Sequence, residues 1–193
     1  MLADELGVGV DEARWLLLEH IRVCFDTCHM AVAFEDPSEV LARFDAIGIK
    51  VGKVQISSAL KVMFPADLGE RTSLERGLQP FVESTYLHQV VQRNRDGTRS
   101  QFPDLMDALG SIHDPRTAEW RIHFHVPIFM ERYGPFLSTQ PEIKQVLALL
   151  QARRFSQHLE IETYTWDVLP PDLKHDLTDS IAREYAWVRH VFL

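Results

Sequence analysis

The chain has 193 residues, of which 46% are hydrophobic and 25% are charged, a composition typical of a folded globular domain. Its 28 acidic and 20 basic side chains give a formal net charge of −8, which disfavours nucleic acid as a partner. Two cysteines cannot build a disulfide framework, and neither a signal-peptide pattern nor an apolar run of about 18 residues is found, so we predict a cytoplasmic protein without a membrane span.

Apolar spacing, capping residues and turn signals predict alternating helices and strands along the chain. Asp36 can cap a helix that Gly48 ends, and Asp11 can begin an earlier one. Asp96-Gly97 lies between two β-prone flanks, which indicates an inserted hairpin. In chain order we expect helix 11–20, strand 21–26, helix 35–48, strand 49–60, a loop and helix within 61–79, hairpin 85–102, helix 103–110, strand 120–129, helix 138–155, strand 158–166 and a helical tail 170–193.

This order contains a strand followed by a helix four times. Such alternation requires crossover connections and therefore predicts a parallel sheet in an α/β fold. The runs RVCFD (22–26) and KVQIS (53–57) are nearly apolar, as expected for strands that are covered on both faces. Periodicity leaves two architectures open, an open doubly wound sheet and part of a barrel.

Polar side chains of metal-binding types fall at or near the ends of the four expected strands. In a parallel sheet these ends lie at one edge, and in a barrel they surround one pocket. Carboxylates and imidazoles that meet in this way are the ligands of divalent metals. The residues concerned are Asp26, His29, Gln55, Ser57, Ser58, His123, His125, Glu160 and Glu162.

Each of these residues also has a purely structural interpretation. Asp26 could cap a turn, a single histidine could be a hydrogen-bonded core residue, and His88 on the hairpin favours a structural role. Cys24 is expected to be a small buried hydrophobe, and a zinc pair with Cys28 is disfavoured because no second cysteine pair exists. Nucleotide-binding glycine motifs, GxSxG and HExxH are absent from the sequence.

Four stretches together resemble a known superfamily. DTCH (26–29), VQISSAL (54–60), HFHVPIF (123–129) and LEIETYTW (159–166) are similar to the C-terminal half of xylose-isomerase-like TIM barrels. That superfamily includes sugar-phosphate isomerases and epimerases and endonuclease IV. With YLHQV (86–90), the set is most similar to the EboE family of metabolite traffic proteins, which implies a role in metabolite biosynthesis or trafficking.

The resemblance implies about four βα units of a barrel within one partial domain, residues 1–193, and assigns roles to six residues. It makes Asp26 and His29 metal ligands and puts Gln55 where those families usually have a histidine ligand. It makes Glu162 a metal ligand and often a base. His123 and His125 match a metal-binding polar pair, and we expect His125 to assist Glu162 in catalysis. The implied cofactor is a divalent metal, Mn, Mg or Zn, and the implied partner is a small sugar-like metabolite.

Two departures from the family pattern shape the expected function. Gln55 is a weak neutral ligand, which argues against an endonuclease-like site with three zinc ions. Four strands of the barrel are not in this sequence, so we expect a homodimer, or a separate N-terminal half barrel, to cover the open edges. We predict a metal-dependent sugar (phosphate) isomerase or epimerase. The alternatives are a non-catalytic metabolite-binding protein, an inactive fragment and an endonuclease IV-like zinc phosphodiesterase.

Overall fold

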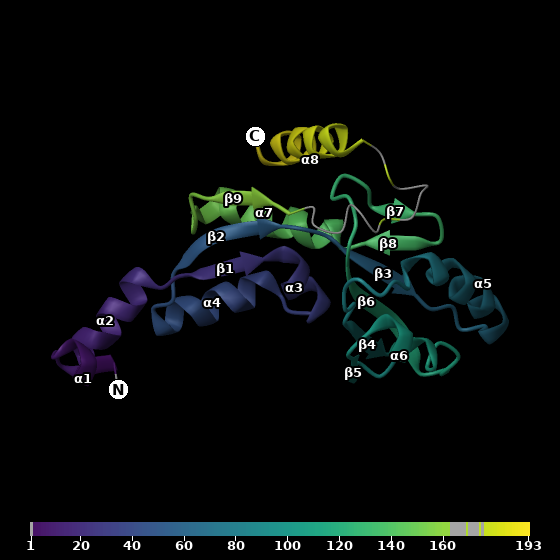
Figure 1. Ribbon diagram of the computed structural model, residues 1–193, viewed down its shortest axis with the longest axis horizontal. Coiled ribbons are helices and arrows are strands. Elements are labelled where there is room, and N and C mark those ends of the chain that lie inside the picture. The colour runs from purple at the N-terminus through teal and green to yellow at the C-terminus, as the bar shows by residue number, and fades with distance from the viewer. Residues whose placement is uncertain (1, 163–168, 170–173, 175) are drawn as a thin grey trace.

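The computed structural model describes residues 2–162, 169, 174 and 176–193. Its two sheets lie side by side, and two N-terminal helices project from one end (Figure 1). The helices are α1 (Leu2–Leu6), α2 (Val10–His20), α3 (Thr27–Val32), α4 (Pro37–Ile47), α5 (Leu68–Leu78), α6 (Leu105–Leu109), α7 (Gln140–Arg153) and α8 (Leu177–Phe192). The strands are β1 (Val23–Asp26), β2 (Val51–Ile56), β3 (Ala59–Met63), β4 (Val90–Asn94), β5 (Arg99–Phe102), β6 (Thr117–His125), β7 (Arg132–Tyr133), β8 (Phe136–Ser138) and β9 (Leu159–Ile161).

The smaller sheet is parallel, with the strand order β1-β2-β9. One face carries Phe25, Val54 and Ile56, which pack against α4, α7 and α8 in a hydrophobic cluster. The opposite face carries polar side chains such as Lys53 and Gln55, both only partly buried. The expectation of strands apolar on both faces is therefore wrong here, because alternate residues of β2 point to a core and to a polar surface.

The larger sheet is antiparallel, with the strand order β5-β4-β6-β3-β8-β7. Its central strand β6 contains most of the segment 120–129, which we expected to be the third parallel strand. That expectation is wrong. Trp120, Ile122 and Phe124 are fully buried on one face of β6 in a second hydrophobic cluster, and β3 and β4 pair with β6 antiparallel on either side. The protein is thus mixed α/β, and within the described residues three strands are parallel in place of the expected four.

The segment 49–60 was expected to form one strand, but it divides into β2 and β3 at Ser57 and Ser58. Both serines are buried, and here the chain passes from the parallel sheet to the antiparallel sheet. The Thr27 hydroxyl holds this crossing point, because it donates to the Ser57 carbonyl at 2.7 Å and accepts from the Ser57 amide at 2.9 Å. The crossing therefore brings the ends of β1 and β2 close to β6.

Most local predictions agree with the structure. Asp36 caps α4, and Gly48 ends it with a left-handed backbone, φ 80°. The hairpin forms with Gly97 at φ 85°, although it is an integral edge of the larger sheet and not an isolated insertion. Asp11 lies within the first turn of α2, where Gly9 is the N-cap instead. Residues 163–166 of the expected strand 158–166 lie outside the described residues.

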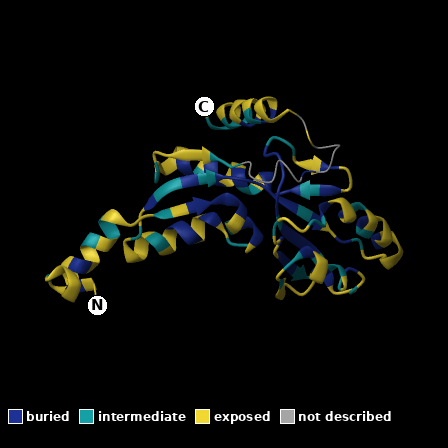
Figure 2. Cartoon of the chain, in the orientation of Figure 1, coloured by how far each residue is buried: buried dark blue, intermediate teal, exposed yellow. Residues whose placement is uncertain are grey.

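The N-terminal helices α1 and α2 are mostly exposed (Figure 2). Val10, Trp15 and Ile21 expose 60–68% of their surface. β1 and β9 form the edges of the parallel sheet. Association with a second copy or with an N-terminal half barrel stays a prediction. Over the described part of the chain, every helix is too short or too polar to cross a bilayer.

Helix α8 carries a buried acid. Glu184 is 2% exposed, and its Oε1 accepts from the Ile128 amide at 3.2 Å. Burial raises the pKa of this carboxyl from 4.5 to about 7. The hydroxyl of Tyr133, whose pKa burial also raises, lies close by and donates to the Pro127 carbonyl. The ionised form of Glu184 is therefore disfavoured in the folded protein.

We expect the free energy of unfolding to fall as pH rises from about 4.5 to about 7, because in this range the folded carboxyl holds a proton that the unfolded one has lost. The difference in pKa corresponds to about 3 kcal/mol. Glu184→Gln should remove this dependence of the free energy of unfolding on pH, as measured by urea unfolding between about pH 5 and pH 8. An unchanged slope in the variant would contradict the assignment, and Glu131→Gln, at an exposed position, is the control.

Candidate functional site

Asp26, the last residue of β1, organises one side of the site. Its Oδ1 accepts from the amides of Cys28 at 2.9 Å and His29 at 3.1 Å, which caps α3. The same oxygen accepts from the Ser57 hydroxyl at 3.0 Å. The structural interpretation of Asp26 as a cap is therefore correct. Its second oxygen, Oδ2, remains directed toward the other polar groups of the site, 3.9 Å from His29 Nε2.

Gln55 joins two carboxylates across the C-terminal edge of the parallel sheet. Its Nε2 donates to Asp26 Oδ2 at 3.2 Å and to Glu162 Oε2 at 2.6 Å. The two donated hydrogen bonds offset the repulsion between the acids. In this rotamer Gln55 is a donor, while its Oε1 accepts from Cys24 Sγ at 3.6 Å. A half-turn of the terminal amide would direct Oε1 to the carboxylates and offer an oxygen ligand.

Glu162 follows β9 and is held by its backbone amide, which donates to the Ile56 carbonyl at 3.1 Å. Burial raises the pKa of Glu162, the Gln55 hydrogen bond lowers it, and the negative charge of Asp26 raises it again. The net direction is upward. A carboxyl with a raised pKa is a better proton acceptor and donor pair than an ordinary surface carboxyl.

The histidines of β6 share the polar face of that strand, as their spacing of two predicts. His123 Nε2 and His125 Nε2 are 3.2 Å apart, and the ring of His29 packs edge-on against His123 with centroids 4.3 Å apart. His125 Nδ1 lies 3.7 Å from Glu162 Oε2. Burial lowers the pKa of His123 to about 4 and of His125 to about 3. Both imidazoles are therefore neutral at neutral pH and able to bind a metal.

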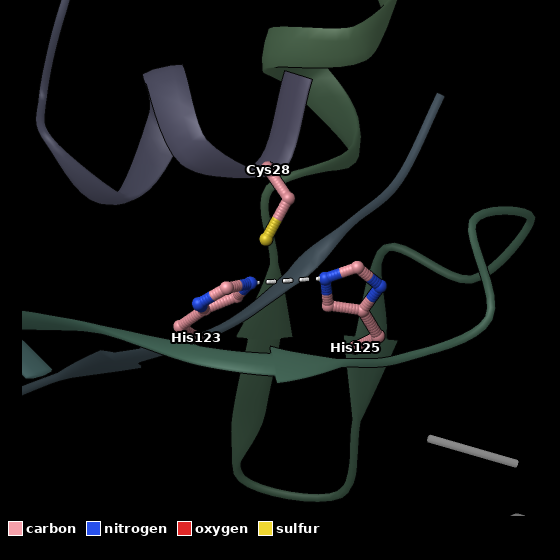
Figure 3. Close-up of side chains that lie close together, drawn as sticks. All are labelled: Cys28, His123 and His125. Carbon is pink, nitrogen blue, oxygen red and sulfur yellow. Dashed lines mark hydrogen bonds between the residues drawn. The ribbon is translucent and has the colours of Figure 1, made fainter. Parts of the chain in front are cut away.

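Cys28 completes the group and was missed as a site residue. Figure 3 shows its sulfur directed from α3 toward the two imidazoles of β6. The Cys28 Sγ and one ring nitrogen each of His123 and His125 lie within 4.8 Å of one another. The sequence analysis considered Cys28 as a zinc partner of Cys24. Cys24 is exposed on β1, so the expectation that it is a buried hydrophobe is wrong. One feature of the sequence could have pointed to Cys28. Asp26 caps the short helix that contains Cys28, and this cap holds Cys28 beside the site.

Two other candidates have structural partners. His88 is buried, its Nε2 lies 2.6 Å from Glu83 Oε1, and its Nδ1 lies 3.1 Å from the His123 carbonyl. His88 therefore positions the backbone of β6, in agreement with a structural role. Glu160 forms an ion pair with Lys53 at 2.7 Å. Both side chains are partly exposed, so this pair contributes little to stability.

The structure brings the six predicted residues together through a continuous set of contacts. Three of them, Asp26, Gln55 and Glu162, lie at the C-terminal edge of the parallel sheet. The histidines come from α3 and from the antiparallel strand β6. The parallel sheet therefore contributes two carboxylates and an amide, while α3 and the antiparallel sheet contribute imidazoles.

Comparison of the chain with models of protein families, with curated proteins and with solved structures found no match. The resemblance to xylose-isomerase-like barrels therefore remains an expectation, and the function has to be argued from the site itself.

Proposed function

We propose that the protein is a divalent-metal-dependent isomerase or epimerase that acts on a small sugar-like metabolite or its phosphate. The observation that carries the proposal is the position of Glu162, 3.7 Å from the neutral imidazole of His125 and linked by Gln55 to Asp26. An acid with a raised pKa beside a neutral imidazole is a suitable pair for moving a proton between two carbons or oxygens of a hydroxy-carbonyl compound.

The proposed roles follow from where each group lies. Glu162 accepts the proton next to the carbonyl carbon and returns it to the product, and His125 carries the second proton. A bound divalent ion would polarise the carbonyl oxygen. Its ligands would come from Asp26, His29, Gln55, His123, His125 and Glu162. The amide of Gln55 holds the two carboxylates together.

The resemblance supports this proposal further. We propose that the parallel strands correspond to part of a xylose-isomerase-like barrel, and that the protein acts in a metabolite biosynthesis or trafficking pathway. In support, Asp26, Gln55 and Glu162 lie at the carboxyl ends of their strands, where barrel enzymes place catalytic groups. The antiparallel sheet would then be an elaboration of that framework.

A non-catalytic metabolite-binding protein is the second candidate. It is favoured by Gln55, because the amide nitrogen, and not an oxygen, faces both carboxylates. An inactive fragment would likewise show no turnover of substrate. A zinc phosphodiesterase is less favoured, because a net charge of −8 repels a nucleic-acid backbone.

We expect about one Mn, Mg or Zn per chain in the purified protein, since about three or more neutral or anionic ligands meet at the site. Asp26→Asn should lower metal affinity at least about tenfold while an asparagine still caps α3. Elemental analysis after gel filtration and competition with a chelator measure both effects. Glu160→Gln, a nearby carboxylate paired with Lys53, is the matched control and should bind metal like the wild type.

The three competing functions give different results. About three zinc ions per chain would favour the phosphodiesterase. Absence of metal, together with unchanged ligand binding in Asp26→Asn, would contradict the proposed enzyme and favour metabolite binding without turnover.

A further inference from the structure

The sulfur of Cys28 and the nitrogens of two histidines form a compact group that the sequence pattern did not predict. Cys28 is fully buried, His125 is 3% exposed and His123 is half-buried. The three side chains come from two elements, α3 and β6, which pack against each other. In Figure 3 the sulfur and both Nε2 atoms face a common point between the helix and the strand.

The spacing of these atoms fits a tetrahedral ion. Zinc binds imidazole nitrogen at about 2.0–2.1 Å, so two ligands at a tetrahedral angle lie about 3.3 Å apart. The two Nε2 atoms are 3.2 Å apart. A thiolate at about 2.3 Å from the same ion would lie about 3.5 Å from each nitrogen. The sulfur and ring nitrogens are within 4.8 Å of one another, so each sulfur–nitrogen distance has to shorten by at most about 1.3 Å, which is within reach of a side-chain rotation.

The groups around these side chains match those that orient metal ligands. Zinc-bound histidines commonly donate their second ring N–H to a carboxylate. Here Glu162 Oε2 lies 3.7 Å from Nδ1 of His125, so the two atoms have to approach by about 0.5 Å to form this hydrogen bond. The backbone of Cys28 is held by two hydrogen bonds from its amide, to Asp26 Oδ1 at 2.9 Å and to the Ser57 hydroxyl at 3.3 Å. The backbone of Cys28 is therefore held in position, while its side chain can still rotate to bind an ion.

The donor set also selects the metal. One thiolate and two imidazoles are soft and borderline ligands, which favour zinc over the magnesium and manganese that oxygen ligands prefer. Three protein ligands leave one tetrahedral position for water or a substrate oxygen, the pattern of catalytic rather than structural zinc sites.

We propose that Cys28, His123 and His125 bind one zinc ion whose fourth position is open. On binding, the thiol of Cys28 loses its proton to solvent and a sulfur–zinc bond forms. This inference deepens the proposed function and shares its premise that an ion binds at this site. It adds a ligand and a metal identity, and it can be tested without any substrate.

Cobalt(II) substitution of the full chain provides the test, because cobalt reports its ligands. Titration of the metal-free protein with cobalt should produce the near-ultraviolet thiolate-to-cobalt charge-transfer band and the intense visible bands of tetrahedral cobalt. Zinc should displace the cobalt with a stoichiometry of about one per chain. Cys28→Ser should abolish the charge-transfer band and lower zinc affinity about 100-fold or more, since loss of even an outer partner of a ligand costs about 10–100-fold.

Cys24→Ser is the matched control, because Cys24 lies on β1 outside this group of ligands and should retain the wild-type spectrum. A wild-type spectrum that contains tetrahedral cobalt without the thiolate band would overturn the proposal, and this result does not depend on whether Cys28→Ser folds. Cobalt binding in Cys28→Ser equal to the wild type would overturn it as well. If the thiolate band appears but the zinc-loaded protein moves no protons of sugar substrates, the proposed isomerase fails while the zinc site stands.

Discussion

Replacing Glu162 with glutamine should lower turnover of the substrate by about 10²–10⁴-fold, the usual contribution of a positioned general base. Glutamine keeps the size of the side chain and can still hydrogen-bond to Gln55, but it cannot accept a proton from carbon. The substrate would be sought among aldoses, ketoses and their phosphates. Incorporation of solvent deuterium next to the carbonyl, followed by NMR in D2O, measures the proton transfer directly.

Two measurements make this result specific. Glu160→Gln changes a carboxylate two residues away whose partner is Lys53, and it should leave exchange unchanged. Metal content of Glu162→Gln should stay close to that of the wild type, because the other five candidate ligands are unchanged and glutamine keeps a side-chain oxygen at this position. Full exchange activity in Glu162→Gln would exclude it as the base. Loss of metal together with activity would instead identify Glu162 as a ligand, as the family resemblance allows.

Replacing Arg71 with alanine should lower the free energy of unfolding by about 3–5 kcal/mol, the largest effect on stability that we expect. Arg71 lies on α5 and is fully buried. Its guanidinium group donates to the backbone carbonyls of Pro65, Ile112, Asp114 and Thr117 at 2.7–3.1 Å. The group also stacks over the ring of Phe64, with 5.1 Å between its carbon and the ring centroid.

These hydrogen bonds connect segments that secondary structure does not join. The loop before α5, the turn after α6 and the start of β6 meet at this one side chain. Alanine would remove the donor from the carbonyls of Pro65, Ile112 and Thr117, whereas the Asp114 carbonyl would keep the Thr117 amide at 3.0 Å. Each carbonyl left without a donor costs about 1–3 kcal/mol before relaxation and water entry reduce it. Lysine keeps the positive charge but lacks the planar set of donors, so Arg71→Lys should be intermediate.

Urea unfolding followed by circular dichroism measures the change. Arg76→Ala is the matched control on the same helix. Arg76 is exposed, and its Nε donates a long hydrogen bond of 3.4 Å to the Thr72 carbonyl. Its effect should stay within about 0.5 kcal/mol. Equal midpoints for Arg71→Ala and the control would show that the guanidinium contributes no more than a surface arginine.

The strand β6 shows why the pairing of strands was mispredicted. In WRIHFH (120–125) apolar and polar residues alternate strictly, which is common in antiparallel strands with two unlike faces. The run KVQIS (53–57) of the parallel sheet alternates in the same way, so this pattern by itself does not separate the two sheets. The prediction of four parallel strands therefore placed 120–129 in the same sheet as these runs. In the structure, the apolar side of β6 enters the core while His123 and His125 face α3.

The sequence by itself determined the elements whose signals lie within a few residues. Asp36 and Gly48 bound α4, Asp96-Gly97 turns the hairpin, and the apolar spacing of 138–155 marks α7, because caps and turns are made by neighbouring groups. Only the tertiary structure decided which strands pair, where the chain crosses between sheets at Ser57 and Ser58, and that Cys28 lies against two histidines almost a hundred residues further along the chain. Those outcomes depend on burying two separate apolar clusters at once, and no short stretch of sequence carries that information.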